Sequence, residues 1–146
     1  MSINQIQDEI IDEFSLLDDW MDRYELLIDY GKGLQPLPDA DKTDQNLIDG
    51  CQSKVWFTAE LDCSDAAQPK VIYHGDSDAI LVKGIVALLI HVLSGHTAKE
   101  IVDADLYFID KINLREHLSP TRSNGLVAML KQMRLFALAY LSTVKQ

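Results

Sequence analysis

The stretch that decides the fold is a turn followed by a strand, and it reads Asp49-Gly50-Cys51-Gln52-Ser53-Lys54-Val55-Trp56-Phe57-Thr58-Ala59. Its second half is β-branched and aromatic, which is typical of a half-buried strand. Its first half places Cys51 directly after a glycine, and glycine permits tight backbone geometry without a side chain to block approach. Such a turn can present a thiol to a partner. The alternative, that Cys51 is a small loop residue without chemistry, stays open from this stretch alone.

A second strand-like run, Val71-Ile72-Tyr73, follows after a polar stretch over residues 62–68. Two such runs joined by a polar loop predict an antiparallel hairpin. Residues 46–48 are a candidate for a short third strand. Pro36 and Pro38 make residues 34–44 an irregular, extended connection.

Apolar residues recur at helical spacing on both sides of this hairpin. We expect a helix over residues 3–17 and a second from Asp18 or Asp19 to an end at Gly31 and Gly33. A third should run from about Asp78 to Gly95, with Asp76 or Ser77 as its cap. We expect a short helix after a capping box at Thr97–Glu100, short helical turns within 105–118, and a long helix over 124–144. This order predicts an α+β fold, in which a small antiparallel sheet of about three strands has helices packed on one face. No linker divides the chain, so we expect a single domain over residues 1–146.

The charge of the chain argues against several classes of partner. Its 146 residues carry 23 acidic and 13 basic side chains, a net charge of −10. We therefore expect neither nucleic acid nor an anionic membrane as a partner, since both need a basic face. The longest apolar run, residues 79–93, contains Lys83 and His91 and is too short and polar to span a bilayer. It predicts a buried helix with His91 in the core.

The thiols and imidazoles form no recognisable metal or catalytic pattern. Cys51 and Cys63 form no C-x-x-C pair, and the N-terminus lacks the features of a secretory signal. We expect a cytoplasmic location in which both thiols are free, with a Cys51–Cys63 disulfide as the alternative. Cys63 falls in the predicted hairpin loop and is interpreted as an incidental exposed thiol. None of the four histidines has metal-ligand spacing, so we predict no metal site.

Several segments along the chain form long motifs in a distinctive order. They are Asp19-Trp20 with Arg23-Tyr24, Leu27-Ile28 with Gly31-Lys32, Asn46 with Gly50-Cys51-Gln52-Ser53 and Val55-Trp56, Gly75-Asp76-Ser77-Asp78-Ala79 with Val82-Lys83-Gly84, and residues 117–126, from His117-Leu118-Ser119-Pro120 through Arg122 to Gly125-Leu126. On these motifs the chain resembles the SufE family of sulfur-acceptor proteins, which includes the similar CsdE branch. The hairpin around Cys63 carries no part of this resemblance.

The resemblance implies a protein that activates a pyridoxal-phosphate-dependent cysteine desulfurase of the SufS or CsdA type. It implies that Cys51 accepts persulfide sulfur and delivers it to an iron–sulfur scaffold or another sulfur acceptor. The cofactor belongs to the desulfurase, and this chain is expected to carry none. The SufE and CsdE branches differ in the desulfurase they serve, and the sequence leaves that choice open. A stand-alone cysteine enzyme and a non-catalytic interaction module are alternatives from other classes. The family fold also resembles the U-type cluster scaffolds, but one matching cysteine is too few to ligate a cluster.

The motifs also predict the surroundings of Cys51. We expect its loop to include Gly50, Gln52 and Ser53, and its side chain to turn into a pocket of its own domain until a partner docks. The predicted pocket walls are the turn with Asp76, Ser77 and Asp78 and the segment around Arg122. Arg122 is a candidate for binding the partner, because a guanidinium presents a rigid fork to carboxylates or carbonyls. An internal bridge from Arg122 to Asp76 or Asp78 is the alternative.

Overall fold

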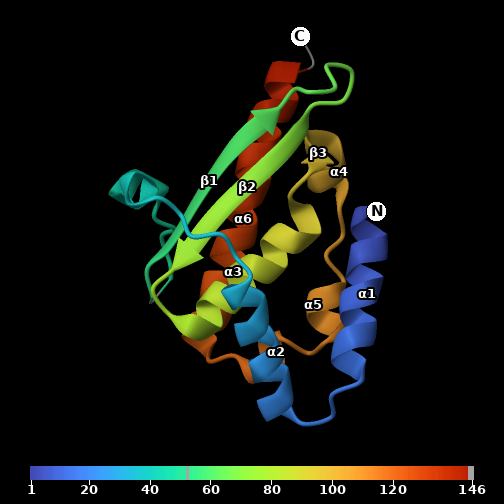
Figure 1. Cartoon of the computed structure of the whole chain (residues 1–146), viewed down its shortest axis with the longest axis vertical. Coiled ribbons are helices and arrows are strands. Elements are labelled where there is room, and N and C mark those ends of the chain that lie inside the picture. The colour runs from blue at the N-terminus through green and yellow to red at the C-terminus, as the bar shows by residue number, and fades with distance from the viewer. Residues whose placement is uncertain (52, 145–146) are drawn as a thin grey trace.

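The computed structural model describes residues 1–51 and 53–144, and its two long strands form a β-hairpin (Figure 1). Strand β1 (Val55–Asp62) pairs antiparallel with β2 (Lys70–Ser77), from the Val55–Ser77 pair to the Asp62–Lys70 pair. Both predicted strands are therefore present, and both are longer than predicted. A two-residue strand, β3 (His96–Thr97), pairs with the other edge of β2.

The third strand predicted at residues 46–48 is wrong. Residues Asp44–Asn46 form a 3₁₀ turn, η2, and Leu47 makes only an isolated bridge to Trp56. The amide of Asn46 donates to Thr43 O and that of Leu47 to Asp44 O, so the turn uses donors that a ladder would need.

The helices follow the predicted order with changed bounds. They are α1 (Ile3–Ser15), α2 (Trp20–Lys32), α3 (Ile80–Leu93), α4 (Ala98–Asp103), α5 (Phe108–Lys111) and α6 (Pro120–Val144), with further 3₁₀ turns η1 (Asp39–Asp41) and η3 (Arg115–His117). The capping box predicted at the start of α4 is confirmed: the Thr97 side chain accepts from Glu100 N, and the Glu100 side chain accepts from Thr97 N. No helix in the described part of the chain has the length and apolar character needed to cross a membrane.

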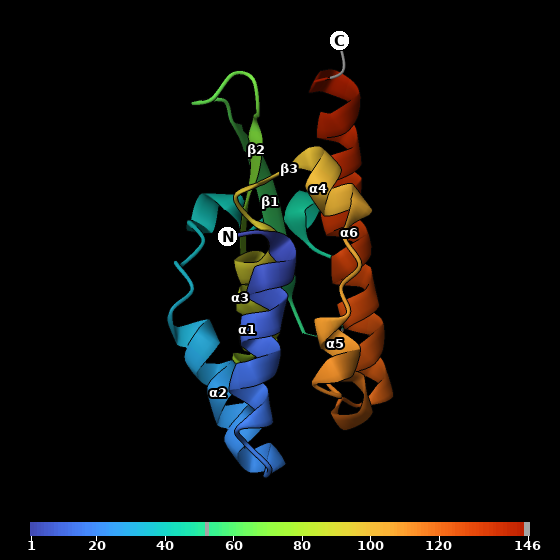
Figure 2. The ribbon, with the colours of Figure 1, turned by 90° about the vertical axis from the view of Figure 1, so that its right-hand side faces the viewer.

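Helices α3 and α6 pack on one face of the sheet, and Figure 2 shows α6 running alongside the hairpin. The buried residues of this face alternate along the strands, as a half-covered sheet requires: Val55, Phe57, Val71 and Tyr73. The Tyr73 hydroxyl donates to Met133 O of α6 at 2.7 Å, and the Tyr140 hydroxyl of α6 donates to Ala59 O at 3.0 Å. The predicted α+β class, with helices on one face of a three-stranded antiparallel sheet, is confirmed.

The ends of three helices differ from the predictions. Gly33 is the C-cap of α2, as predicted, but Gly31 lies buried inside the helix, where an added Cβ would come within 3.0 Å of Gly84 N in α3. Helix α6 begins at Pro120 rather than near residue 124, because proline suits the first helical position and the Ser119 Oγ accepts from Arg122 N. The cap of α3 is Ala79, which makes no side-chain cap bond, and not Asp76 or Ser77. These two residues pair with β1 as the end of β2.

The prediction that His91 is a core histidine is also wrong. It lies on the exposed side of α3, and its ring centroid is 5.8 Å from that of Tyr30. The core face of the same helix is filled by aliphatic residues such as Ile85 and Leu88.

Candidate functional site

Cys51 lies in the turn before β1, against the first turns of α6. Gly50 has φ +92°, a left-handed conformation that side-chain-bearing residues adopt at a cost, so glycine is suited to this turn. The Cys51 side chain is half-buried, and its Sγ lies 3.7 Å from Gly125 O, as a weak S–H donor to that carbonyl. The chain thus turns the thiol inward onto α6.

Gly125 is the residue of α6 that admits the thiol. A Cβ added to Gly125 would stand 3.3 Å from Cys51 Sγ and 3.7 Å from Cys51 Cα. One turn later, a Cβ added to Gly50 would stand 3.6 Å from Ala128 Cβ. A glycine inside a helix costs stability relative to alanine, so its presence here has a packing reason, which is the close approach of Cys51.

A small cavity of about 60 Å³ lies beside the Cys51 thiol. Its described lining is contributed by the cysteine turn, α3 and α6: Cys51, Ser53, Val82, Ile85, Thr121, Arg122, Gly125 and Met129. A water molecule in the liquid takes up about 30 Å³, so the space suits one or two small atoms. Burial raises the pKa of the Cys51 thiol above its ordinary value, and the resting group is therefore the neutral thiol at neutral pH.

The structure brings together only some of the predicted site residues. Gly50, Ser53 and Arg122 lie in the turn or in the cavity wall, while Gln52 lies outside the described residues. Asp76, Ser77 and Asp78 are not among the described lining residues. The apolar walls from Val82, Ile85 and Met129 were missed by the sequence reasoning, although Val82 stands in a quoted motif. Helical periodicity marks such residues as core without saying which of them borders a cavity.

Ser77 and Asp78 contact the cysteine turn at Lys54, three residues after Cys51. Ser77 Oγ donates to Lys54 O at 2.9 Å and accepts from Ala79 N at 3.2 Å. The Asp78 carboxylate accepts from Lys54 N at 3.1 Å, and Asp78 N donates to Lys54 O at 3.2 Å. The end of β2 therefore fixes the point at which the cysteine turn enters β1.

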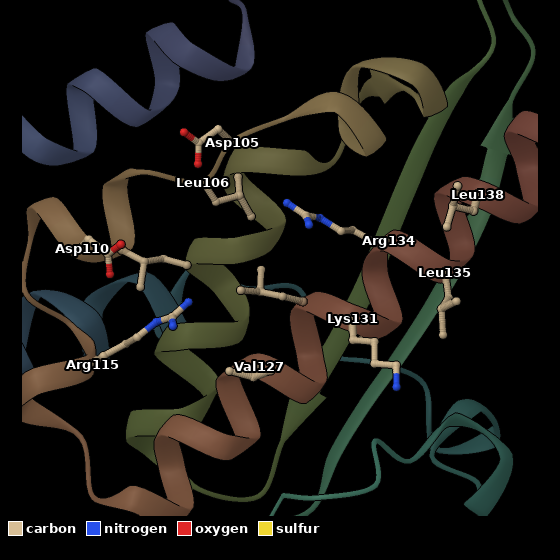
Figure 3. Close-up of a pocket in the computed structure, with 11 residues that line it drawn as sticks. Asp105, Leu106, Asp110, Arg115, Val127, Lys131, Arg134, Leu135 and Leu138 are labelled. Carbon is tan, nitrogen blue, oxygen red and sulfur yellow. The ribbon is translucent and has the colours of Figure 1, made fainter.

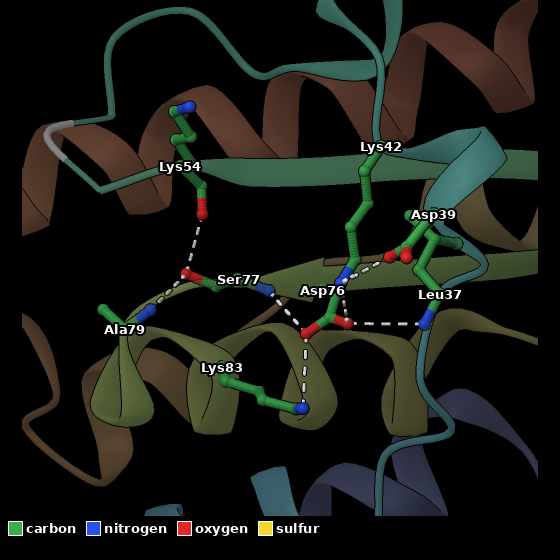
Figure 4. Close-up of polar contacts among 8 residues, drawn as sticks. All are labelled: Leu37, Asp39, Lys42, Lys54, Asp76, Ser77, Ala79 and Lys83. Carbon is green, nitrogen blue, oxygen red and sulfur yellow. Dashed lines mark hydrogen bonds and ion pairs between the residues drawn. The ribbon is translucent and has the colours of Figure 1, made fainter.

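Asp76 holds a different part of the molecule together (Figure 4). The residue is 4% exposed, and its carboxylate accepts from Ser77 N at 2.8 Å and Leu37 N at 3.3 Å. Lys83 Nζ lies 3.3 Å from one oxygen and Lys42 Nζ lies 3.6 Å from the other. Burial by itself raises the pKa of Asp76, but these amides and Lys83 outweigh it and hold the pKa below its ordinary value. Asp76 thus joins α3 and the segment around residues 37–42 to β2.

Arg122 lies in the first turn of α6 with an exposed side chain at the mouth of the cavity. Within the described residues its guanidinium makes no ion pair, and the internal bridge considered for it is not formed. Asp76 is instead paired with two lysines, and Asp78 is bonded to Lys54 N.

A stacked aromatic cluster supports the segment that leads into α6. The ring of His117 stacks on that of Trp20 with centroids 3.6 Å apart, and the Tyr24 hydroxyl donates to His117 O at 2.8 Å. The Arg23 guanidinium lies 5.0 Å from the Trp20 ring centroid and donates to Ile112 O. The motif residues near the start of α2 therefore position the residues just before Pro120 and Arg122.

Comparisons with known proteins agree with this arrangement. Residues 8–137 match the family model described as "SufE: Fe-S metabolism associated domain". The chain belongs to the SufE family. An uncharacterized SufE-like protein of Rhizobium meliloti is 41% identical over 87% of this chain and 91% of its own length. One from Synechocystis is 42% identical over 90% of this chain and 80% of its own length.

One more relative and one solved structure extend the comparison of this SufE-family chain. SufE-like protein 1 of Arabidopsis thaliana, named as chloroplastic/mitochondrial, is 41% identical over 89% of this chain and 34% of its own length. The solution structure of a hypothetical protein from Thermus thermophilus matches the fold with a TM-score of 0.75 over 94% of this chain and 96% of that one, at 21% identity. The family model makes this chain a member of a family of iron–sulfur metabolism, and the Thermus structure shares its fold.

The remaining candidate groups of the SufE-like chain lie apart from the cavity. Cys63 is exposed in the hairpin loop, and both cysteines are free. No cluster of three or more His, Cys, Asp or Glu side chains in the described residues could hold a metal ion.

Proposed function

We propose that this SufE-family protein accepts persulfide sulfur on Cys51 from a pyridoxal-phosphate-dependent cysteine desulfurase and delivers it to iron–sulfur cluster assembly. The observation that carries the proposal is the Cys51 thiol, held against Gly125 beside a cavity of about 60 Å³. Family membership supports the reaction class, and the geometry supports Cys51 as the acceptor. We propose that the acceptor domain spans residues 1–146 and acts in the cytoplasm.

The transfer is a thiol–disulfide type exchange. The Cys51 thiol loses its proton, and the thiolate attacks the outer sulfur of the desulfurase persulfide. The sulfur–sulfur bond of that persulfide breaks, its electron pair stays on the desulfurase cysteine, and that cysteine takes up a proton. Cys51 then carries the transferred sulfur. No external oxidant or reductant is needed, because the outer sulfur moves with its oxidation state unchanged.

The resting position of Cys51 suits a carrier between transfers. Buried and neutral, the thiol is a poor nucleophile, since the thiolate does the chemistry. Docking must therefore turn it outward, and the Gly50 turn is the segment that can move. After transfer, a return to α6 would place the outer sulfur in the cavity lined by Val82, Ile85 and Met129, away from solvent thiols.

Arg122 is the proposed contact with the desulfurase. Its side chain is exposed at the cavity mouth, and no carboxylate of the described residues forms an ion pair with its guanidinium. A guanidinium in this place can bind carboxylates or carbonyls around the partner's active-site entrance. Whether that partner is of the SufS or the CsdA type would be identified by which desulfurase co-purifies from the native cell.

The proposal is tested by intact-mass analysis after incubation with a desulfurase and cysteine. We expect the gain of one sulfur atom in the wild type and in Cys63→Ser, and no gain in Cys51→Ser. A sulfur adduct that persists in Cys51→Ser and disappears in Cys63→Ser would reverse the assignment. A stand-alone cysteine hydrolase would need a base near Cys51, and no histidine stands among the described lining residues. A pure interaction module would keep full desulfurase activation in Cys51→Ser.

A further inference from the structure

A second surface of the molecule, on the side of α6 away from the sheet, has no role in the sulfur-transfer site. A groove of about 470 Å³ runs between α6 and the segment of residues 105–115 (Figure 3). Three of its apolar residues are unusually exposed: Val127 at 50%, Leu135 at 49% and Leu138 at 46%. With Lys131 they recur at helical spacing along one face of α6.

This face stands out because the other large exposed apolar side chains in the described chain do not gather along one helix face. The others are Met1, Leu16, Met21 and Ile80, which lie at helix ends or the N-terminus. Exposed apolar residues gathered along one groove with polar residues among them mark an interaction site more reliably than scattered exposed residues do.

The charge of the groove departs from that of the rest of the protein. Residues 1–50 carry 13 acidic and 3 basic side chains, whereas residues 51–146 carry 10 of each. Helix α6 carries Arg122, Lys131 and Arg134 and no acidic residue. The groove is lined by three cations, Arg115, Lys131 and Arg134, and by two carboxylates, Asp105 and Asp110, so its lining is net positive on an anionic protein.

These three cations are free to meet external carboxylates. Arg134 Nη2 donates to Ala104 O at 3.0 Å, which fixes the side chain but leaves its charge without an anion. No ion pair within the described residues engages Arg115, Lys131 or Arg134. The two carboxylates of the groove, Asp105 and Asp110, lie on the rim opposite α6 (Figure 3).

We propose that this groove binds an amphipathic helix of a partner protein, with its apolar stripe on Val127, Leu135 and Leu138 and acidic residues along its α6 side. Charge complementarity favours acidic residues on the α6 side, where Lys131 and Arg134 stand, whereas the opposite rim carries Asp105 and Asp110 together with Arg115. The span from Val127 to Leu138 is about 16 Å at 1.5 Å per residue, which matches three turns of helix. The Cys51 cavity and the groove lie on different sides of α6, so the proposal does not depend on the proposed function.

The probe is a synthetic helical peptide of three to four turns, with leucines at i, i+3, i+4 and i+7, glutamates on the flank that meets α6 and glutamines on the opposite flank. A matched peptide carries lysine in place of every glutamate. Binding to the full-length protein is measured by fluorescence anisotropy and mapped by amide chemical shifts. We expect saturable binding of the glutamate peptide with a Kd below about 1 mM, weakening with salt, and shifts confined to the groove.

Two variants and a control test the assignment. Leu135→Glu should weaken the glutamate peptide by about tenfold or more, since it removes apolar burial and adds a like charge. Leu16→Glu, another exposed leucine at a distant helix end, should leave binding unchanged. Lys131→Glu should weaken the glutamate peptide a few-fold and strengthen the lysine peptide. Circular dichroism checks that each variant is folded.

Several outcomes would overturn the proposal. Equal binding of both peptides, or binding insensitive to Leu135→Glu, would remove the basis for an acidic helix in this groove. Absence of peptide binding, together with Leu135-dependent binding to phosphatidylserine vesicles, would assign the face to a membrane surface instead. Leu135-dependent self-association in sedimentation would assign it to a second copy of this chain.

Discussion

Two glycines inside helices, Gly84 in α3 and Gly125 in α6, both allow a close approach, but they meet different kinds of neighbour. A Cβ on Gly84 would stand 2.1 Å from Leu27 O and 2.6 Å from Leu27 C, which are backbone atoms of α2. A Cβ on Gly125 would meet Cys51 Sγ at 3.3 Å. The first contact joins two rigid helices, and the second joins a helix to a side chain that can turn away. The same residue type therefore serves the fold in one place and the sulfur site in the other.

The largest effect is expected for Gly84→Ala. The added methyl group cannot be accommodated without separating α2 from α3, because the atoms that it would meet are the backbone O and C of Leu27 in α2. We expect a loss of about 3 kcal/mol or more in the free energy of unfolding, measured by urea denaturation.

Gly33→Ala is the matched control for that variant. Gly33 is the C-cap of α2 with φ −81°, and its added Cβ would be 3.6 Å from Tyr30 O, an ordinary contact. Its stability should stay within about 0.5 kcal/mol of the wild type. Equal stability of the Gly33 and Gly84 variants would contradict the rigid contact.

The second effect is expected at Asp76. Its carboxylate pairs with Lys83, the residue before Gly84 in α3, so it belongs to the same rigid contact region. Asp76→Asn keeps the shape but removes the charge that faces two lysines, so we expect a loss of about 2 kcal/mol. Because the pKa of Asp76 is lowered by folding, its contribution is present above the unfolded pKa of about 3.9 and is lost as pH falls through the folded pKa.

The measurement is the free energy of unfolding between neutral and acid pH. The wild type should lose stability more steeply than Asp76→Asn as pH falls below about 4, so the two curves converge. Parallel curves would show that the Asp76 charge contributes nothing specific. Asp78→Asn is the control, since Asp78 is exposed and, among the described residues, its carboxylate accepts from Lys54 N alone.

Local sequence patterns predicted some of these features and not others. The hairpin, the helix order and the α+β class follow from local periodicity, which is why they were predicted. The Gly31–Gly84 contact and the pairing of Asp76 with Lys42 and Leu37 N join segments distant in sequence, and no local pattern encodes them. Gly31 was read as a helix end and Asp76 as a helix cap, because both readings satisfy local rules. The strand β3 has two residues, too few to carry a period.

The candidate site divides in the same way. Cys51 and the segment around Arg122 were found from motifs, and the structure brings them to one cavity. The cavity walls formed by Val82, Ile85 and Met129 were not predicted. An apolar residue on a helix face shows the same sequence pattern whether it borders the core or a cavity. The placement of Gly125 against Sγ explains a glycine that the sequence could only single out.

The third effect concerns Gly125, whose neighbour is the movable Cys51 side chain. Gly125→Ala should displace the Cys51 side chain outward, since the sulfur and not the helix is free to move. Global stability should change by less than about 1 kcal/mol, because the helix propensity of alanine offsets the lost packing. Displacement also removes the burial that raises the pKa of Cys51, so more thiolate is present at neutral pH.

The measurement is the alkylation rate of Cys51 by iodoacetamide as a function of pH, in a Cys63→Ser background. We expect a several-fold higher rate at neutral pH for Gly125→Ala and a profile shifted to lower pH. A persulfide placed on the variant should also be released faster to dithiothreitol. An unchanged pH profile would mean that Gly125 does not control the position of the thiol.

The smallest effect on stability is expected for Arg122→Ala, although it lies beside the same cavity. The side chain is exposed and, among the described residues, pairs with no carboxylate, so the free energy of unfolding should move by less than about 0.5 kcal/mol. Its loss should nevertheless weaken desulfurase binding and activation, measured by calorimetry and sulfide release. Lys111→Ala is the control, because Lys111 is exposed and is not among the described lining residues of either the cavity or the groove. If both variants activate the desulfurase equally well, Arg122 is a solvated surface residue, and the cavity mouth recognises its partner by other groups. If Arg122→Ala instead lowers the melting temperature and speeds alkylation of Cys51, the guanidinium holds the cysteine turn in place, and any loss of binding follows from that.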